Sequence, residues 1–341
     1  MLVDRGMTGI AVGDIDQAIY AFTNRYPKYL ISLLTHPKFT SYEITKNHRC
    51  HKSISDYSLR LLGSDIYPIE ERRVLKVSIT GDEVSIGEKI GSALEQIKTA
   101  YNTEFNNQVA ILCRNSSTAD KVASGLGLPY KIFKDTELDK LNSYWARFFN
   151  DFLQSYFDPE VFNVDFTSRY FNEEIDYLNY QKALRIIDTL FSLNVAKLHK
   201  YLPQIISLAK MIYPEYEKYD VVELFKQILL DEDKLQTYAP ARQNEVNILS
   251  LHKSKGLEYD IVFHMDLYEY IMPPFKGSQE DYDQSLNLHY VGITRAKKVC
   301  YIMQGTLRHN SDGVCKSACE SSFLYKNNLK SYRRDVNWDK L

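Results

Sequence analysis

A basic turn containing glycine follows a β-rich segment in the sequence LSLHKSKGLEYD. Ser250 and His252 come at the end of this segment, Lys253 and Lys255 carry positive charge, and Gly256 permits a tight backbone turn. A basic glycine turn after a strand is a good arrangement for binding an anion. A solvated surface loop is the alternative. The segment therefore predicts a loop that contacts phosphate.

A second group of chemically useful residues lies near the start of the chain, in VGDIDQAIYAF (residues 12–22). Gln17 carries an amide of the kind that can contact a terminal phosphate or its attacking water. Tyr20 and Phe22 offer ring faces on which bases can stack, an interaction worth about 1–3 kcal/mol per base. A turn with buried aromatic residues is the alternative interpretation.

The elements that position these groups alternate between strands and helices. Residues 9–14 suggest a short buried strand that leads through a turn into a helix. VLKVSI (74–79) and QVAILC (108–113) are β-rich, and residues 87–101 between them have helical periodicity. The β-rich pattern returns at residue 245. Strand–helix–strand order predicts an α/β fold with a parallel sheet.

The middle of the chain has a different pattern. Apolar residues recur at helical spacing from residue 138 to about residue 230, which predicts a block of amphipathic helices interrupting the α/β domain. The residues after about 325 are polar, and we expect them to fray.

The composition limits the possible functions. The 42 basic and 44 acidic residues give a net charge of −2, so nucleic-acid binding would require a local basic groove. The five cysteines suggest reduced thiols, and Cys315 and Cys319 lack a second Cys/His pair nearby, so no metal site is expected. No signal-peptide core or apolar run of membrane-spanning length occurs, which predicts a cytoplasmic protein without a membrane partner.

Taken in order, these motifs, together with ITKNHRC, VAILCRN and YVGITRAKK, resemble the C-terminal part of UvrD/Rep-type superfamily 1 DNA helicases. The resemblance implies the end of a first RecA-like domain at residues 1–45. A second RecA-like domain, P-loop NTPase-like in fold, would comprise residues 46–130 and 245–341. A helical accessory insertion would occupy residues 131–244.

The resemblance also implies roles at a nucleotide site. Gln17, Arg49 and Arg295 match catalytic positions, with Arg295 as an arginine finger, a type of residue worth on the order of 10³–10⁵ in rate. His48 replaces a tyrosine that stacks on adenine, and Glu258, beside Gly256, would accept hydrogen bonds from the ribose. Arg49 could instead cap a helix or pair with an acid.

The same resemblance implies contacts to DNA. They come from Tyr20, Phe22, Arg114, Asn115, Ser250, His252 and Lys253. A surface salt bridge is the alternative role for Arg114. The chain departs from the family pattern at Thr23-Asn24-Arg25, where Arg-Gly-Ala is common, and at Asn287 and His289, where an arginine pair is usual.

The chain contains no G-x-x-x-x-G-K-[ST] loop and no Asp-Glu-x-x-Asp box. ATP and Mg²⁺ are therefore expected to be held mainly by residues outside this chain, in a missing N-terminal motor half or in a partner protein. The expected function is part of an ATP-dependent helicase that moves 3′ to 5′ on single-stranded DNA and unwinds duplex DNA, with little ATP hydrolysis by this chain alone. The alternative is a non-catalytic adapter that binds single strands or docks a protein.

Overall fold

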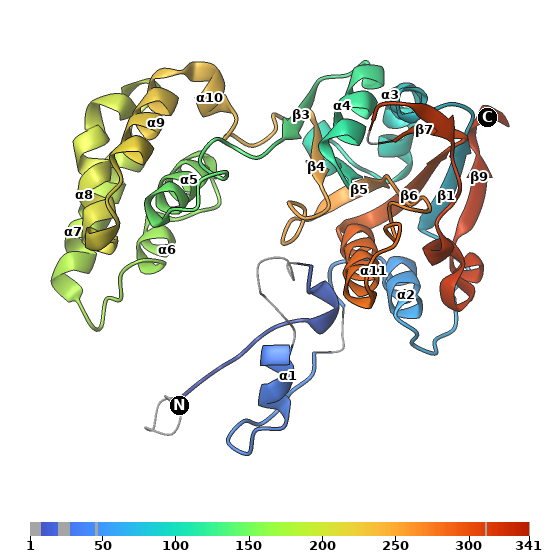
Figure 1. Cartoon of the computed structure of the whole chain (residues 1–341), viewed down its shortest axis with the longest axis horizontal. Helices are drawn as coiled ribbons and strands as arrows, with labels where there is room; N and C mark the ends of the chain where they lie inside the picture. Colours follow the sequence, from blue (N-terminus) through green and yellow to red (C-terminus); the bar gives the residue numbers. More distant parts are fainter. Residues whose placement is uncertain (1–7, 20–27, 45–46, 311, 341) are drawn as a thin grey trace. The chain divides into compact units, whose positions relative to one another are not determined.

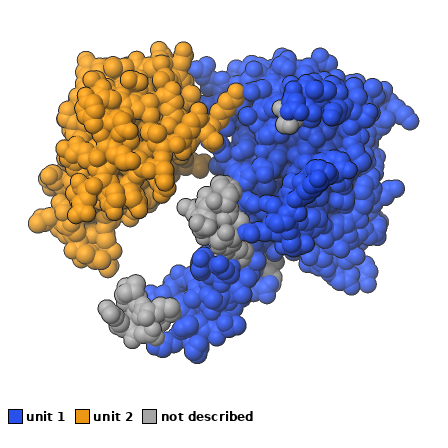
Figure 2. Space-filling model, viewed as in Figure 1, with its two compact units in different colours: residues 1–133, 241–341 blue, residues 134–240 orange. Residues whose placement is uncertain are grey.

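The computed structural model describes residues 8–19, 28–44, 47–310 and 312–340. The chain divides into two compact units, shown in different colours in Figure 2. Unit 1 comprises Met1–Phe133 and Ala241–Leu341, and unit 2 comprises Lys134–Pro240. None of the described helices is both long and apolar enough to cross a membrane.

Unit 1 is built on a seven-stranded sheet in the order β3-β4-β2-β5-β6-β1-β9, and all neighbouring strands are parallel (Figure 1). This confirms the predicted α/β fold with a parallel sheet. The strands are β1 Val74–Ile79, β2 Val109–Cys113, β3 Tyr130–Phe133, β4 Val246–Ser250, β5 Tyr259–His264, β6 Ala296–Gly305 and β9 Arg334–Asn337. A separate antiparallel hairpin joins β7 Leu307–His309 to β8 Cys315–Ser317.

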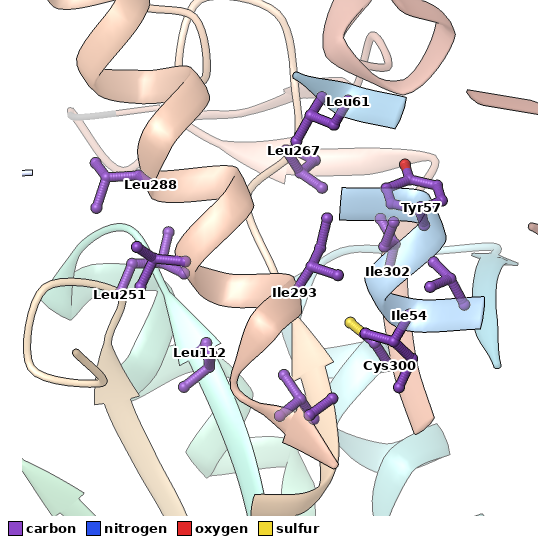
Figure 3. Close-up of a cluster of buried hydrophobic side chains, with 14 of the residues drawn as sticks. Ile54, Tyr57, Leu61, Leu112, Leu251, Leu267, Leu288, Ile293, Cys300 and Ile302 are labelled. Atoms are coloured by element: carbon purple, nitrogen blue, oxygen red, sulfur yellow. The ribbon is translucent and has the colours of Figure 1, made fainter. Parts of the chain in front are cut away.

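Two apolar clusters form the core of unit 1. One packs α2 (Lys52–Leu61) and α11 (Gln279–Thr294) on the sheet, and Figure 3 shows Ile54, Leu288 and Leu112 within it. The other contains residues of α3 (Glu83–Ala100) and α4 (Ser116–Leu126). These two helices can approach closely because Gly91 has no side chain. A Cβ at this position would lie 1.9 Å from the Leu126 carbonyl oxygen. The sheet is therefore covered by helices, as expected for parallel strands.

The described residues after 325, up to residue 340, are folded onto unit 1, so the expectation that they fray was wrong. β9 pairs with β1 in parallel register, with Leu75 opposite Arg334. Trp338 is buried beside Tyr301, with a ring-centroid distance of 5.7 Å. The segment is polar because an edge strand keeps much of its surface in water, while one tryptophan anchors it.

The predicted strand at residues 9–14 is not a strand in the structure. Ile10 and Val12 are each 87% exposed, and no described strand pairs with this segment. The predicted helix after it is a single 3₁₀ turn, Ile15–Gln17, while a separate helix α1 spans Lys28–Leu34. An apolar run forms a strand only when a neighbouring strand satisfies its backbone groups.

Unit 2 is helical, as the periodicity predicted. It contains α5 Tyr144–Phe157, α6 Asn163–Ser168, α7 Tyr177–Phe191, α8 Leu202–Ile212, α9 Tyr219–Leu230 and α10 Glu232–Gln236. Aromatic residues dominate its core. Phe149 stacks on Phe225 with a ring-centroid distance of 4.1 Å, and Trp145 Nε1 donates a hydrogen bond to the Tyr213 carbonyl at 3.0 Å.

Candidate nucleotide and nucleic-acid site

The carboxyl ends of β2 and β4 bring together two segments that are far apart in sequence. Cys113 pairs with Ser250 in the sheet register, and the Leu251 N–H donates to the Cys113 carbonyl at 2.9 Å. Arg114 and Asn115 follow β2, while the basic glycine turn follows β4. The carboxyl edge of a parallel sheet is where open α/β folds bind their ligands.

The turn after β4 is held by its own backbone. The Ser254 N–H donates to the Ser250 carbonyl at 3.0 Å, and the Lys253 N–H donates to Ser250 Oγ at 3.2 Å. Gly256 has a φ of +90°, in the region that favours glycine, and a Cβ there would meet open space. Gly256 is thus required by the backbone conformation rather than by crowding.

His252 lies in this turn as a neutral side chain at physiological pH. Burial, and then the charge of Arg114, lower the pKa of His252 to about 4. A neutral imidazole offers one donor and one acceptor, in contrast to the charged lysines of the same turn. His252 can therefore contact a phosphate or sugar by a hydrogen bond, without adding charge.

Arg114 is positioned by a residue that the sequence analysis missed. Asp266, just past β5, accepts from the Arg114 backbone N–H at 2.7 Å and from Thr118 Oγ1 at 2.9 Å. Asp266 is buried, has a φ of +66°, and burial raises its pKa. Its place immediately after a buried β-rich segment was the available signal.

Asn115 already serves a structural purpose. Its Oδ1 accepts from the Thr118 N–H at 2.9 Å and so caps the start of α4. This cap uses only the amide oxygen, so the side-chain N–H groups can still donate to a phosphate.

The two arginines expected at the nucleotide site meet around Glu258. Arg49 Nε forms an ion pair with Glu258 Oε1. Arg295 is 1% exposed and donates from Nη1 to the Leu257 carbonyl at 3.2 Å and from Nε to the Val291 carbonyl at 3.1 Å. Burial, and then the charge of Arg49, lower the pKa of Arg295. The structure thus brings Arg49, Glu258 and Arg295 together from three segments.

The segment that carries Gln17 is attached to the same region by its backbone. Lys255 Nζ donates to the Gln17 carbonyl at 2.7 Å, Asn287 Nδ2 to the Ala18 carbonyl at 3.2 Å, and Gln284 Nε2 to the Ile19 carbonyl at 2.8 Å. The Gln17 side chain donates to Asp14 Oδ2 at 2.6 Å. Gln284 and Asn287 therefore position this segment, a role that sequence analysis did not assign.

The remaining predicted residues lie at the edge of the site or outside the described part. His48 is exposed beside Arg49, whose N–H donates to Asn47 Oδ1 at 2.8 Å. Tyr20 and Phe22 lie outside the described residues, as do Thr23-Asn24-Arg25.

Comparison with known families assigns part of this architecture. Residues 171–305 match the family model of the UvrD-like helicase C-terminal domain. This part of the chain is therefore similar to the UvrD-like helicase C-terminal domain. The matched residues include the turn after β4, with Glu258, and also Arg295, whereas Arg49, Arg114 and Gln17 precede them.

Individual relatives are similar over short stretches. The chain is 33% identical over 100 residues to the ATP-dependent DNA helicase Rep of Buchnera aphidicola, covering 29% of this chain and 15% of that protein. It is 39% identical over 83 residues to DNA helicase II of Rickettsia typhi, covering 23% and 12%. It is also 37% identical over 70 residues to the ATP-dependent DNA helicase PcrA of Staphylococcus epidermidis, covering 19% and 10%. The matched stretches are thus a small part of these relatives' length.

Proposed function

We propose that this chain is part of an ATP-dependent DNA helicase that couples ATP hydrolysis to movement on single-stranded DNA, 3′ to 5′, and to duplex unwinding. The observation that carries the proposal is the meeting of Arg49, Glu258 and Arg295 beside the segment that holds Gln17. Guanidinium groups suit the charge that spreads over a transferring phosphoryl group. Several relatives are named as ATP-dependent DNA helicases.

In this proposal, Arg49 and Arg295 stabilise the phosphate charge, and Gln17 orients the attacking water. Glu258 accepts hydrogen bonds from the ribose, His48 stacks on the base, and Gly256 lets the turn approach the nucleotide. Mg²⁺ and most of the triphosphate are held by residues outside this chain, because the sequence contains no phosphate-gripping loop of the G-x-x-x-x-G-K-[ST] type. The chain alone should therefore hydrolyse little ATP.

The proposed DNA path follows the carboxyl ends of β2 and β4. Arg114, Asn115, Ser250 and Lys253 would contact backbone phosphates, and neutral His252 would add a hydrogen bond. Such contacts are independent of sequence and sensitive to salt. Tyr20 and Phe22 would stack on bases.

The domain assignment belongs to the same proposal. Residues 1–45 would complete a first RecA-like domain, supplied mainly by an N-terminal motor half or by a partner protein. Residues 46–130 and 245–341 would form the second RecA-like domain, with residues 131–244 as the accessory insertion. The exposed apolar residues Ile10 and Val12 support this, because a strand supplied from elsewhere could cover them.

A non-catalytic adapter that binds single-stranded DNA is the second candidate. The sequence favours it in one respect, since neither the phosphate-gripping loop nor the Asp-Glu box is present. Under this alternative, the DNA-facing residues would still bind DNA, and Arg49 and Arg295 would have no catalytic role.

Two measurements on the purified chain test these proposals. Fluorescence anisotropy with labelled single-stranded DNA should detect binding that weakens with salt, and Arg114→Ala or Lys253→Ala should each reduce the salt slope by about 1. The matched control is Lys121→Ala, on α4. Unchanged binding in both site variants would overturn the DNA path.

Magnesium-dependent ATP hydrolysis is the second measurement, with and without single-stranded DNA. We expect no turnover by the chain alone. Turnover that Arg49→Ala removes would contradict the expected inactivity and favour the enzyme over the adapter.

A further inference from the structure

The β7–β8 hairpin brings a histidine and a cysteine next to the start of α3. In the hairpin register, His309 lies opposite Cys315. One ligating atom from each of Asp82, His309 and Cys315 lies within 4.8 Å of the other two. These residues come from segments separated by more than two hundred positions, and none of them belongs to the proposed motor site.

Asp82 precedes α3 and uses only one of its two carboxylate oxygens to cap the helix. Asp82 uses Oδ1 to cap the helix, accepting from the Val84 N–H at 3.0 Å and from the Ser85 N–H at 3.2 Å. Its other oxygen, Oδ2, lies 4.0 Å from His309 Nδ1. Asp82 can therefore ligate through Oδ2 and still cap the helix through Oδ1.

Glu83 holds the imidazole of His309. Its Oε1 accepts from the His309 N–H at 2.9 Å, and its Oε2 lies 2.7 Å from His309 Nδ1. Glu83 is 3% exposed, so this carboxylate is held within the fold rather than freely rotating in water. A neutral imidazole that donates its Nδ1 proton to Glu83 has its lone pair on Nε2. Carboxylates fix metal-binding histidines in this way.

We propose that Asp82, His309 and Cys315 form a zinc site, with Glu83 orienting the imidazole. A thiolate, an imidazole and a carboxylate are a ligand set that suits Zn²⁺. Tetrahedral zinc at about 2.0–2.3 Å from each ligand places ligand atoms about 3.5 Å apart. The ligand atoms lie within 4.8 Å of one another, so metal binding needs a contraction of up to about 1.3 Å relative to this spacing. The exposed Cys315 side chain can move toward the other two ligands by rotation, and the Asp82 carboxylate and the His309 ring must also move so that Oδ2 and Nε2 both face the metal.

The site would tie the hairpin to the helix that covers one face of the sheet. The connection between β7 and β8 would then be fixed at its base by the metal as well as by the strand pairing. The sequence does not reveal this arrangement, because Cys315 and Cys319 are the candidate ligands closest together in sequence. The fold instead brings Cys315 together with His309 and Asp82. The proposal is independent of the motor function.

Zinc titration of the whole chain in metal-free buffer tests the site, with calorimetry as the readout. We expect one equivalent to bind, and we expect binding to be lost in Cys315→Ser and in His309→Ala. Cys319→Ser is the matched control and should bind as the wild type does. Glu83→Gln should weaken binding by about 10–100-fold, because the amide has a single acceptor oxygen for the backbone N–H and the Nδ1–H of His309 and lacks the carboxylate charge.

Cobalt substitution gives a readout that does not depend on stability. Co²⁺ bound to the wild type and to Cys319→Ser should show a thiolate-to-metal charge-transfer band, and Cys315→Ser should lack it. Circular dichroism without metal checks that each variant is folded. The proposal is overturned if folded wild-type protein binds no zinc, if Cys315→Ser retains the band, or if Cys319→Ser alone removes it.

Discussion

Arg49 and Glu258 form an ion pair across 209 positions of sequence, joining the segment before α2 to the turn after β4. Their side chains are 34% and 39% exposed, respectively. Exposed pairs of this kind contribute about 0–1 kcal/mol because water screens them. The ion pair can therefore hold Arg49 near Arg295, and Arg49 can leave Glu258 to bind a phosphate at a small cost in free energy.

A double-mutant cycle on Arg49→Gln and Glu258→Gln should give a coupling free energy below about 1 kcal/mol in urea unfolding. The matched control is the pair Lys234–Glu137 in unit 2, whose side chains are 36% and 48% exposed. A coupling several times larger than that of the control pair would contradict the view that Glu258 holds Arg49 only loosely.

Arg295→Ala should lower the free energy of unfolding by about 1–3 kcal/mol, because the buried carbonyl of Val291 and the partly buried carbonyl of Leu257 each lose a donor. Arg49→Ala should cost less than 1 kcal/mol, since Arg49 is partly exposed. Urea unfolding of both variants measures the difference. Equal, small losses would mean that Arg295 does not support the fold at the end of α11, and activity tests on Arg295 need this stability control.

Gly256→Ala should cost about 1–3 kcal/mol through backbone strain alone, because φ is +90° and open space surrounds the position. Gly127→Ala is a suitable control, since its φ is +65° and its surroundings are also open. Both variants should lose stability in thermal unfolding. Only Gly256→Ala should weaken single-stranded DNA binding; equal binding by the two variants would remove the turn from the DNA path.

The stability of the fold should fall with acid in part because of His264, whose Nε2 lies 3.2 Å from Nδ1 of His289, a second buried histidine with a lowered pKa. Burial lowers the pKa of His264 from 6.5 to about 4, so between these pH values the unfolded chain binds a proton that the folded chain does not. Stability therefore decreases as pH falls through this window, by up to about 1.4 kcal/mol per pH unit for this one group.

Urea unfolding between pH 7 and pH 4.5 measures this slope. His264→Gln should reduce the slope by about that amount, whatever its effect at pH 7. The control is His36→Gln, at a partly exposed position after α1, which should leave the slope as it is in the wild type. An unchanged slope in His264→Gln would show that the acid sensitivity has another source.

The sequence was sufficient to predict β1, β2, β5 and β6, because each is a run of β-branched and apolar residues that the sheet buries on both faces. It did not predict β3, YKIF, or β9, RDVN. Both are short edge strands with polar residues, and only the pairing with a neighbour makes them strands. The strand expected at residues 9–14 failed for the converse reason, since its apolar pattern has no described partner.

The candidate site was partly visible in the sequence. Basic residues, a glycine and arginines could be named from the motifs, because side-chain chemistry and local spacing are sequence properties. The supporting contacts could not be predicted from the sequence. Asp266 accepts a hydrogen bond from the Arg114 N–H, and Gln284 and Asn287 donate to backbone carbonyls before residue 20. Each of these hydrogen bonds joins residues more than 150 positions apart. Such contacts depend on how the sheet and α11 bring distant segments together.

The position of unit 2 in the chain has a topological consequence. β3 and β4 are neighbours in the sheet and run parallel, and the chain between them is unit 2. Parallel neighbours cannot be joined by a tight turn, so the chain must cross over by a dozen or more residues to begin the next strand. Unit 2 is therefore the crossover itself. A variant that lacks most of unit 2 would keep the sheet only if about a dozen or more residues still connected Phe133 to Val246.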